Sequence, residues 1–174
     1  ELWQMYDEAG MKADADPLLA RLVLQGDNQA KTLWQDAGRS IGDFNLAWTT
    51  NLQLAKGSDP KIASWAAGWI ASQDEAKLLA RAQEARPVIE GLLTSADNKD
   101  RPALALKLAA LVKETERTAP DLPWRLYQLY SRNGLSSQAQ ASLTEAKKAN
   151  IADAWKESAS AAAGTQALTE WLEI

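Results

Sequence analysis

The sequence contains neither cysteine nor histidine. Without cysteine the protein has no disulfide bond and no thiolate nucleophile, and without both residues it cannot form a zinc site from thiolate and imidazole ligands. The absence of histidine also excludes every acid–base mechanism that depends on an imidazole near neutral pH. Catalysis would have to rest on carboxylates, lysine, tyrosine, serine or threonine, and the residues present imply no cofactor.

Long hydrophobic runs are missing as well. No stretch approaches the roughly 20 consecutive apolar residues that a membrane-spanning helix needs. The net charge of −4 disfavours nucleic acid as a partner, because neutralisation of phosphates dominates such binding. Residues 101–150 nevertheless carry eight basic and four acidic side chains, a local excess that favours an acidic peptide partner.

Hydrophobic residues make up 46% of the 174 residues, enough for the core of one compact domain. Eight tryptophans stand against three tyrosines and one phenylalanine, which favours helix–helix contacts and groove walls as their places. We expect residues 1–174 to form a single helical-repeat domain that is part of a longer chain. The lack of cysteine suits cytoplasm and periplasm alike, with a slight preference for the bacterial periplasm.

Helix start and stop signals recur along the chain. Asp16-Pro17 and Asp59-Pro60 each place a carboxylate acceptor before a proline whose fixed φ suits the first helical position. Ser72 has the spacing to Glu75 that is typical of a capping box. These pairs predict helix starts near 17, 60 and 73.

Glycines supply the matching stop signals. Gly26 is followed at once by Asp27, and Gly134 is followed closely by Ser137, so each glycine is expected to end one helix just before the next begins. Gly164 is expected to do the same near the end of the chain. Pro87 is interpreted either as a kink in one long helix or as a boundary between two.

Apolar residues recur at helical steps of three and four between these signals, and no window alternates in the manner of a strand. The chain is therefore predicted to be all-α, and its short connections predict antiparallel helix pairs. The predicted helices are 2–11, 17–25, 28–38, 43–56, 60–71, 73–85, 87–97, 102–118, 122–133, 137–149, 151–162 and 165–172.

The best-formed local pattern spans residues 122–150. Large side chains on its first helix, a glycine turn and small side chains on its second helix allow close packing of the pair. The positions are Leu126, Tyr130, Gly134, Ala139, Leu143 and Ala146. This segment resembles a tetratricopeptide helix pair, and weaker copies of the alanine spacing occur after Gly26 and in 105–112. The resemblance implies an α-solenoid, a superhelix of stacked antiparallel helix pairs with a concave groove.

In such a superhelix the first helix of each pair lines the concave side. The resemblance therefore places Trp124, Arg125, Gln128 and Arg132 in the groove. Trp124 would offer an apolar platform, Gln128 would bind backbone amides, and the two arginines would bind carboxylates.

Acidic clusters do not indicate chemistry. Residues 97–100 contain two aspartates in a short run that lacks the ligand spacing of a calcium loop, so we expect a solvated connection. Glu114 and Glu116 are two apart and cannot share a helix face. We therefore expect neither a metal site nor catalysis in this segment.

Three functions remain open. The first is a non-catalytic adaptor or scaffold that binds a peptide or protein segment, with an acidic one favoured, in a concave groove. The second is the superhelical, non-catalytic arm of a bacterial cell-wall enzyme such as a lytic transglycosylase. The third is a helical bundle that encloses a small apolar ligand among its tryptophans. The sequence leaves the oligomeric state open.

Overall fold

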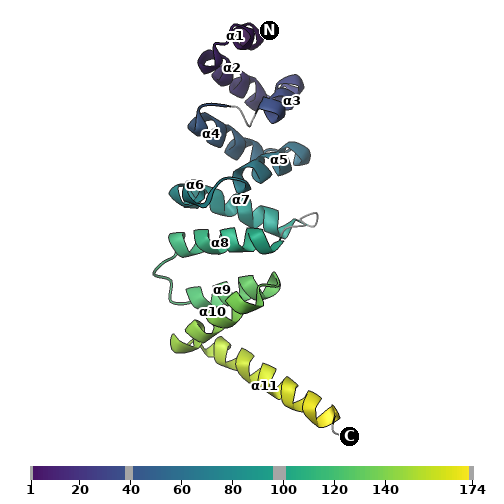
Figure 1. Ribbon diagram of the computed structural model, residues 1–174, viewed down its shortest axis with the longest axis vertical. Coiled ribbons are helices and arrows are strands. Elements are labelled where there is room, and N and C mark those ends of the chain that lie inside the picture. The colour runs from purple at the N-terminus through teal and green to yellow at the C-terminus, as the bar shows by residue number, and fades with distance from the viewer. Residues whose placement is uncertain (1, 38–40, 96–100, 173–174) are drawn as a thin grey trace. The chain divides into compact units, whose positions relative to one another are not determined.

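The computed structural model describes residues 2–37, 41–95 and 101–172, and every described element is a helix (Figure 1). The all-α prediction is confirmed for these residues, which contain no strand. The chain divides into two compact units, Glu1–Ala96 and Asp97–Ile174.

Eleven helices are described, seven in the first unit and four in the second. The first unit contains α1 (Leu2–Glu8), α2 (Lys12–Leu24), α3 (Asn28–Ala37), α4 (Phe44–Ala55), α5 (Pro60–Ala71), α6 (Glu75–Ala80) and α7 (Ala82–Thr94). The second unit contains α8 (Arg101–Thr115), α9 (Leu122–Arg132), α10 (Ser136–Lys148) and α11 (Ala152–Leu172).

Of the two predicted proline starts, one is confirmed and one is wrong. Asp59 caps α5 by accepting hydrogen bonds from the backbone N–H groups of the second and third helical residues, and Pro60 stands at the first position. Pro17 instead lies inside α2, which begins at Lys12. The reason is that Gly10 already reverses the chain, so the helix starts more than a turn before the proline.

The predicted boundaries around residues 72–87 are also wrong. Asp74, not Ser72, caps α6 by accepting the N–H of Lys77 at 2.9 Å, while the Ser72 hydroxyl donates to the carbonyl of the preceding helix. The break that follows falls at Arg81, where φ is −129° and ψ is 36°. Pro87 lies inside α7 and marks no boundary.

Gly164 does not separate two helices, because α11 runs from Ala152 to Leu172 without interruption. Glycine permits a left-handed turn but does not impose one. The predicted break between helices 151–162 and 165–172 is therefore wrong, since one helix spans both ranges.

Four connections are built in the same way. In each, one residue has positive φ: Gly10 (74°), Gly26 (92°), Gly134 (75°) and Asn150 (60°). The residue after it donates its N–H to the carbonyl five residues back, at 2.8 to 3.2 Å, and the next helix begins one residue later. This is the Schellman arrangement, which satisfies the free carbonyls at a helix end. It confirms the predicted turns at Gly26 and Gly134.

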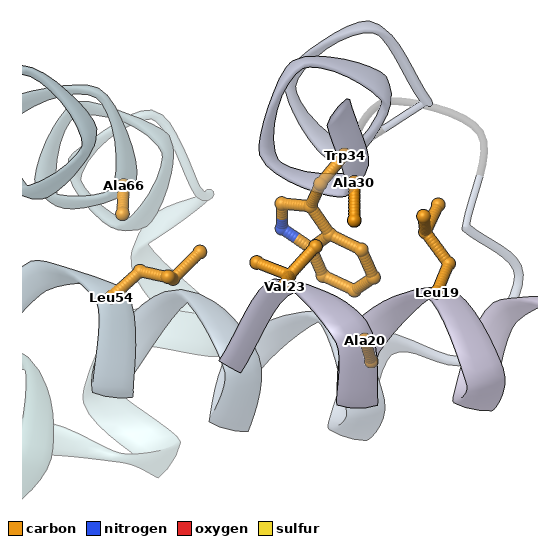
Figure 2. Packing of buried hydrophobic residues seen from close by; sticks show 7 residues of the cluster. All are labelled: Leu19, Ala20, Val23, Ala30, Trp34, Leu54 and Ala66. Carbon is orange, nitrogen blue, oxygen red and sulfur yellow. The ribbon is translucent and has the colours of Figure 1, made fainter. Parts of the chain in front are cut away.

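The core of the first unit joins α2, α3, α4 and α5. Its buried members are Leu19, Ala20, Val23, Ala30, Trp34, Leu54 and Ala66. Figure 2 shows the indole of Trp34 directed from α3 toward α2, beside Val23. Trp34 is 0% exposed, and its N–H donates to Oδ1 of the equally buried Asn51 at 3.2 Å. In this unit α4 packs on both α2 and α5, and α7 packs on both α4 and α5.

The second unit is centred on the α9–α10 pair, with α8 packed on α9 and α11 packed on α10. The five side chains that the sequence predicted to fill this pair are all buried: Leu126, Tyr130, Ala139, Leu143 and Ala146. Ala154 of α11 packs against Leu143 and Ala146 and is 0% exposed. Small side chains thus bring α11 close to α10 as well.

Candidate partner-binding surfaces

The predicted binding residues of α9 do share a face. Arg125, Gln128 and Arg132 follow one another at steps of three and four, on the side of the helix away from the buried Leu126 and Tyr130. Gln128 is half-buried and Arg132 is exposed. This face therefore offers an amide and a guanidinium to solvent.

Trp124 lies at the edge of that face and is half-buried. Its ring stacks on Tyr127 with the two centroids 5.0 Å apart, and it packs against the cluster of Leu143, Ala146 and Ala154. Much of the indole that was expected to line a groove thus packs within the unit.

Arg125 is held inside the unit by carboxylates. Its guanidinium forms ion pairs with Glu116, just after α8, and with Asp121, whose Oδ2 lies 3.5 Å from Nε. The arginine thereby joins α9 to the chain that leads into it. Arg132 makes no ion pair among the described side chains, so it is the guanidinium of this face that remains available for a partner.

Two contacts fix the start of α11 against the α9–α10 pair. The Tyr127 hydroxyl donates to Oε1 of Glu157 at 2.9 Å, and the Lys147 ammonium lies 5.5 Å from the centre of the Trp155 ring. Burial, followed by the hydrogen bond to Glu157, raises the pKa of the Tyr127 phenol. Trp155 remains 54% exposed on its outer side.

A surface groove of about 360 Å³ lies between α2 and α4 in the first unit. We call it the α2–α4 groove. Its lining mixes apolar side chains with groups that can hydrogen-bond: Pro17, Ala20, Arg21, Leu24, Gln25, Leu46, Thr49, Thr50 and Gln53.

The α2–α4 groove has the chemistry that was predicted for α9. Arg21 is exposed and makes no ion pair within residues 2–37, 41–95 and 101–172. The amides of Gln25 and Gln53 are also exposed, and Leu24 keeps 43% of its surface in water. The sequence signal for this site is an apolar residue at the end of α2, Leu24, with Arg21 about one turn before it and Gln25 directly after it. Leu24 read alone is indistinguishable from a core leucine.

A second surface groove, of about 660 Å³, lies in the second unit on the side of α9 that carries Leu126. We call it the α9–α10 groove. It is lined by Lys113, Leu122, Pro123, Leu126, Ala141, Ser142, Thr144 and Glu145. The predicted residues Arg125, Gln128 and Arg132 do not line it, because they lie on the opposite side of α9.

An aromatic cluster joins α4 to α5, α6 and α7. The Phe44 ring lies 5.8 Å from Trp48 and 6.2 Å from Trp69, and the Arg81 guanidinium lies 5.3 Å from Trp48. Glu84 accepts the Trp48 N–H at 2.6 Å and lies 3.5 Å from Arg81. Since the polar groups of this cluster bind one another, it holds helices together.

The described side chains include no group of three or more metal-ligating residues. The acidic run at 97–100 lies outside the described residues. No described helix is both long enough and apolar enough to cross a membrane.

No family model, no curated protein and no solved structure matches the chain. The resemblance of residues 122–150 to a tetratricopeptide pair stays a prediction.

Proposed function

We propose that the chain is a non-catalytic protein-interaction module, an α-solenoid that binds an acidic peptide segment in the α2–α4 groove. The observation that carries the proposal is the lining of this groove. It brings the exposed Arg21, the exposed Leu24 and the exposed glutamines Gln25 and Gln53 into one groove. Adaptor function is the first of the three functions that the sequence left open.

The packing of the first unit supports a solenoid. Helix α4 packs on α2 as well as on its neighbour α5, and α7 packs on both α4 and α5. The same Schellman turn joins α1 to α2 and α2 to α3. If α2–α3 and α4–α5 are successive pairs, α2 and α4 are the first helices of each. First helices line the concave surface of such stacks, which is where a segment binds.

The chemistry of the groove fits a peptide better than a free apolar ligand. A guanidinium binds a carboxylate through two parallel hydrogen bonds, and Gln25 and Gln53 can donate to and accept from a peptide backbone. Leu24 and Leu46 supply the apolar contact. The fully buried Trp34 and Trp48 have partners for their N–H groups inside the protein and do not line this groove.

The face of α9 that carries Gln128 and Arg132 is a candidate contact surface of the second unit, taken by itself. Its exposed guanidinium and its amide supply there what Arg21 and Gln25 supply in the α2–α4 groove. Arg125 contributes less, because Glu116 and Asp121 already bind its charge.

The test is selection of binders from a displayed library of random dodecapeptides, using the full chain as bait. Selected peptides are synthesised with a fluorescent label, and their affinities are measured by fluorescence anisotropy. We expect acidic peptides that lose at least about tenfold in affinity on Arg21→Ala or Gln25→Ala, the loss of one charge-assisted contact. Arg132→Ala measures the contribution of α9.

Lys61→Ala is the matched control, because Lys61 is an exposed cation of the first unit outside the groove. It should leave affinity unchanged. The proposal fails if selection yields no binder, or if every binder is insensitive to Arg21→Ala, Gln25→Ala and Arg132→Ala. Circular dichroism of each variant shows whether the helices are intact.

A further inference from the structure

The fold covers the apolar lining of the α9–α10 groove only in part. Leu126 is 6% exposed, and Leu122 and Pro123 beside it on α9 are half-buried. Ala141 of α10 adds an exposed apolar surface to the same groove. A partner that covered these side chains would remove apolar surface from water, which favours binding.

The two charged side chains that line the groove differ in whether they have an ion-pair partner. Lys113 is exposed and makes no ion pair among the side chains that the structure describes. Glu145 is compensated, since its Oε1 lies 2.8 Å from the ammonium of Lys148. The uncompensated charge of the groove is therefore positive, as is the excess over residues 101–150. Such a surface attracts a negatively charged partner.

The groove has a volume of about 660 Å³, and binding sites commonly range over about 300–1,000 Å³. It is an open groove and not an enclosed cavity. A free small ligand needs most of its surface buried to bind well, whereas a peptide can insert one or two side chains and leave its backbone in water. The shape thus favours a peptide.

We infer that the α9–α10 groove is a second binding site, for a peptide segment in which an apolar side chain stands next to aspartate or glutamate. The apolar side chain packs on Leu122 and Leu126, and the carboxylate pairs with Lys113. The site lies in the second unit and shares no residue with the α2–α4 groove or with the predicted face of α9. Its failure would leave the proposed function standing, and the reverse also holds.

The absence of cysteine makes a direct test possible. Thr144→Cys on the full chain gives a single thiol in the groove, to which an environment-sensitive dye is attached. The probes are two displayed dodecapeptide libraries with a fixed leucine followed by either glutamate or lysine. We expect binders from the glutamate library alone, with a saturable change of dye emission, and an affinity loss of at least about tenfold on Lys113→Glu.

Two further variants compare the same added charge inside and outside the groove, which separates an effect on binding from an effect on folding. Ala141→Glu adds a charge inside the groove and should abolish the dye response. Gln140→Glu adds the same charge on an exposed neighbouring position outside the groove and should leave the dye response unchanged. The inference is overturned if the glutamate library gives no binder, if lysine peptides bind equally, or if Lys113→Glu has no effect. A saturable response to dodecanoate without any peptide binder would also overturn it, in favour of a free apolar acid.

Discussion

The indole N–H of Trp48 on α4 donates a hydrogen bond to Oε2 of Glu84 on α7, across 2.6 Å. Trp48 is 0% exposed, so in the native structure its N–H is shielded from water and Glu84 is its acceptor. Glu84 also lies 3.5 Å from Arg81, the residue between α6 and α7, whose guanidinium packs over the Trp48 ring. One carboxylate thus fixes both the indole and the arginine that covers it.

We expect Glu84→Ala to lower the free energy of unfolding by about 1–3 kcal/mol, because it leaves a buried N–H without an acceptor. Glu84→Gln should cost less, since its amide oxygen can still accept the bond. The measurement is urea unfolding followed by circular dichroism. Gln83→Ala, on the exposed neighbouring position of α7, is the control and should stay within about 0.5 kcal/mol of wild type. In a Trp48→Phe background the effect of Glu84→Ala should shrink, and an unchanged effect would show that the bond contributes nothing.

In the core of the first unit, Asn51 accepts the hydrogen bond of a buried tryptophan, as Glu84 does for Trp48. Its Oδ1 accepts the Trp34 N–H at 3.2 Å, while its Nδ2 donates to the carbonyl of Ala47 at 2.9 Å. Asn51→Leu has a similar volume but cannot accept a hydrogen bond, so we expect a loss of about 1–3 kcal/mol in the free energy of unfolding. Thr49→Ala, on the exposed side of the same helix, should change it by less than about 0.5 kcal/mol. Equal stability of Asn51→Leu and wild type would contradict the prediction.

The turn at Asn150 predicts opposite effects for two glycine substitutions. Asn150 has φ 60°, a conformation that costs most L-residues about 1–2 kcal/mol and asparagine less. We therefore expect Asn150→Gly to raise the free energy of unfolding by a few tenths of a kcal/mol to about 1 kcal/mol, and Asn150→Ala to lower it by about 1 kcal/mol. Ala149 has φ −74°, so Ala149→Gly should lower stability. Thermal unfolding of the three variants checks the signs.

The local parts of this fold could be predicted from the sequence. Gly134 with Ala139 and Leu143 indicated a tight pair at 122–150, and the predicted core of that pair is buried. The turns were predicted less completely than the helix pair. Gly10 and Asn150 form the same turn as Gly26 and Gly134, but no proline or strong capping residue in the sequence marks them. The helix start that Asp16-Pro17 predicted is therefore wrong, because α2 already begins at Lys12.

The surfaces could not be predicted in the same way, because they depend on contacts between distant residues. Periodicity shows which face of α9 is apolar, but not that Ala154 brings α11 close enough to bury part of Trp124. The α2–α4 groove is lined by both Arg21 and Gln53, which lie on different helices, and no local sequence pattern reports that they share a groove. Arg125 appeared free because its partner Glu116 lies outside its own helix.

Tyr127 gives the last prediction, a dependence of stability on alkaline pH. Burial and the hydrogen bond to Glu157 raise the pKa of Tyr127 above its ordinary value of about 10, so the folded state keeps the phenol proton at pH values where the unfolded state has lost it. The stability that this tyrosine contributes is present below about pH 10 and is lost as pH rises through the raised value. We therefore expect the difference in unfolding free energy between wild type and Tyr127→Phe to become less favourable to wild type from about pH 9 to pH 11. Glu157→Gln removes the carboxylate, so it should weaken this trend. A difference that stays constant with pH in urea unfolding experiments would show that Tyr127 ionises alike in both states.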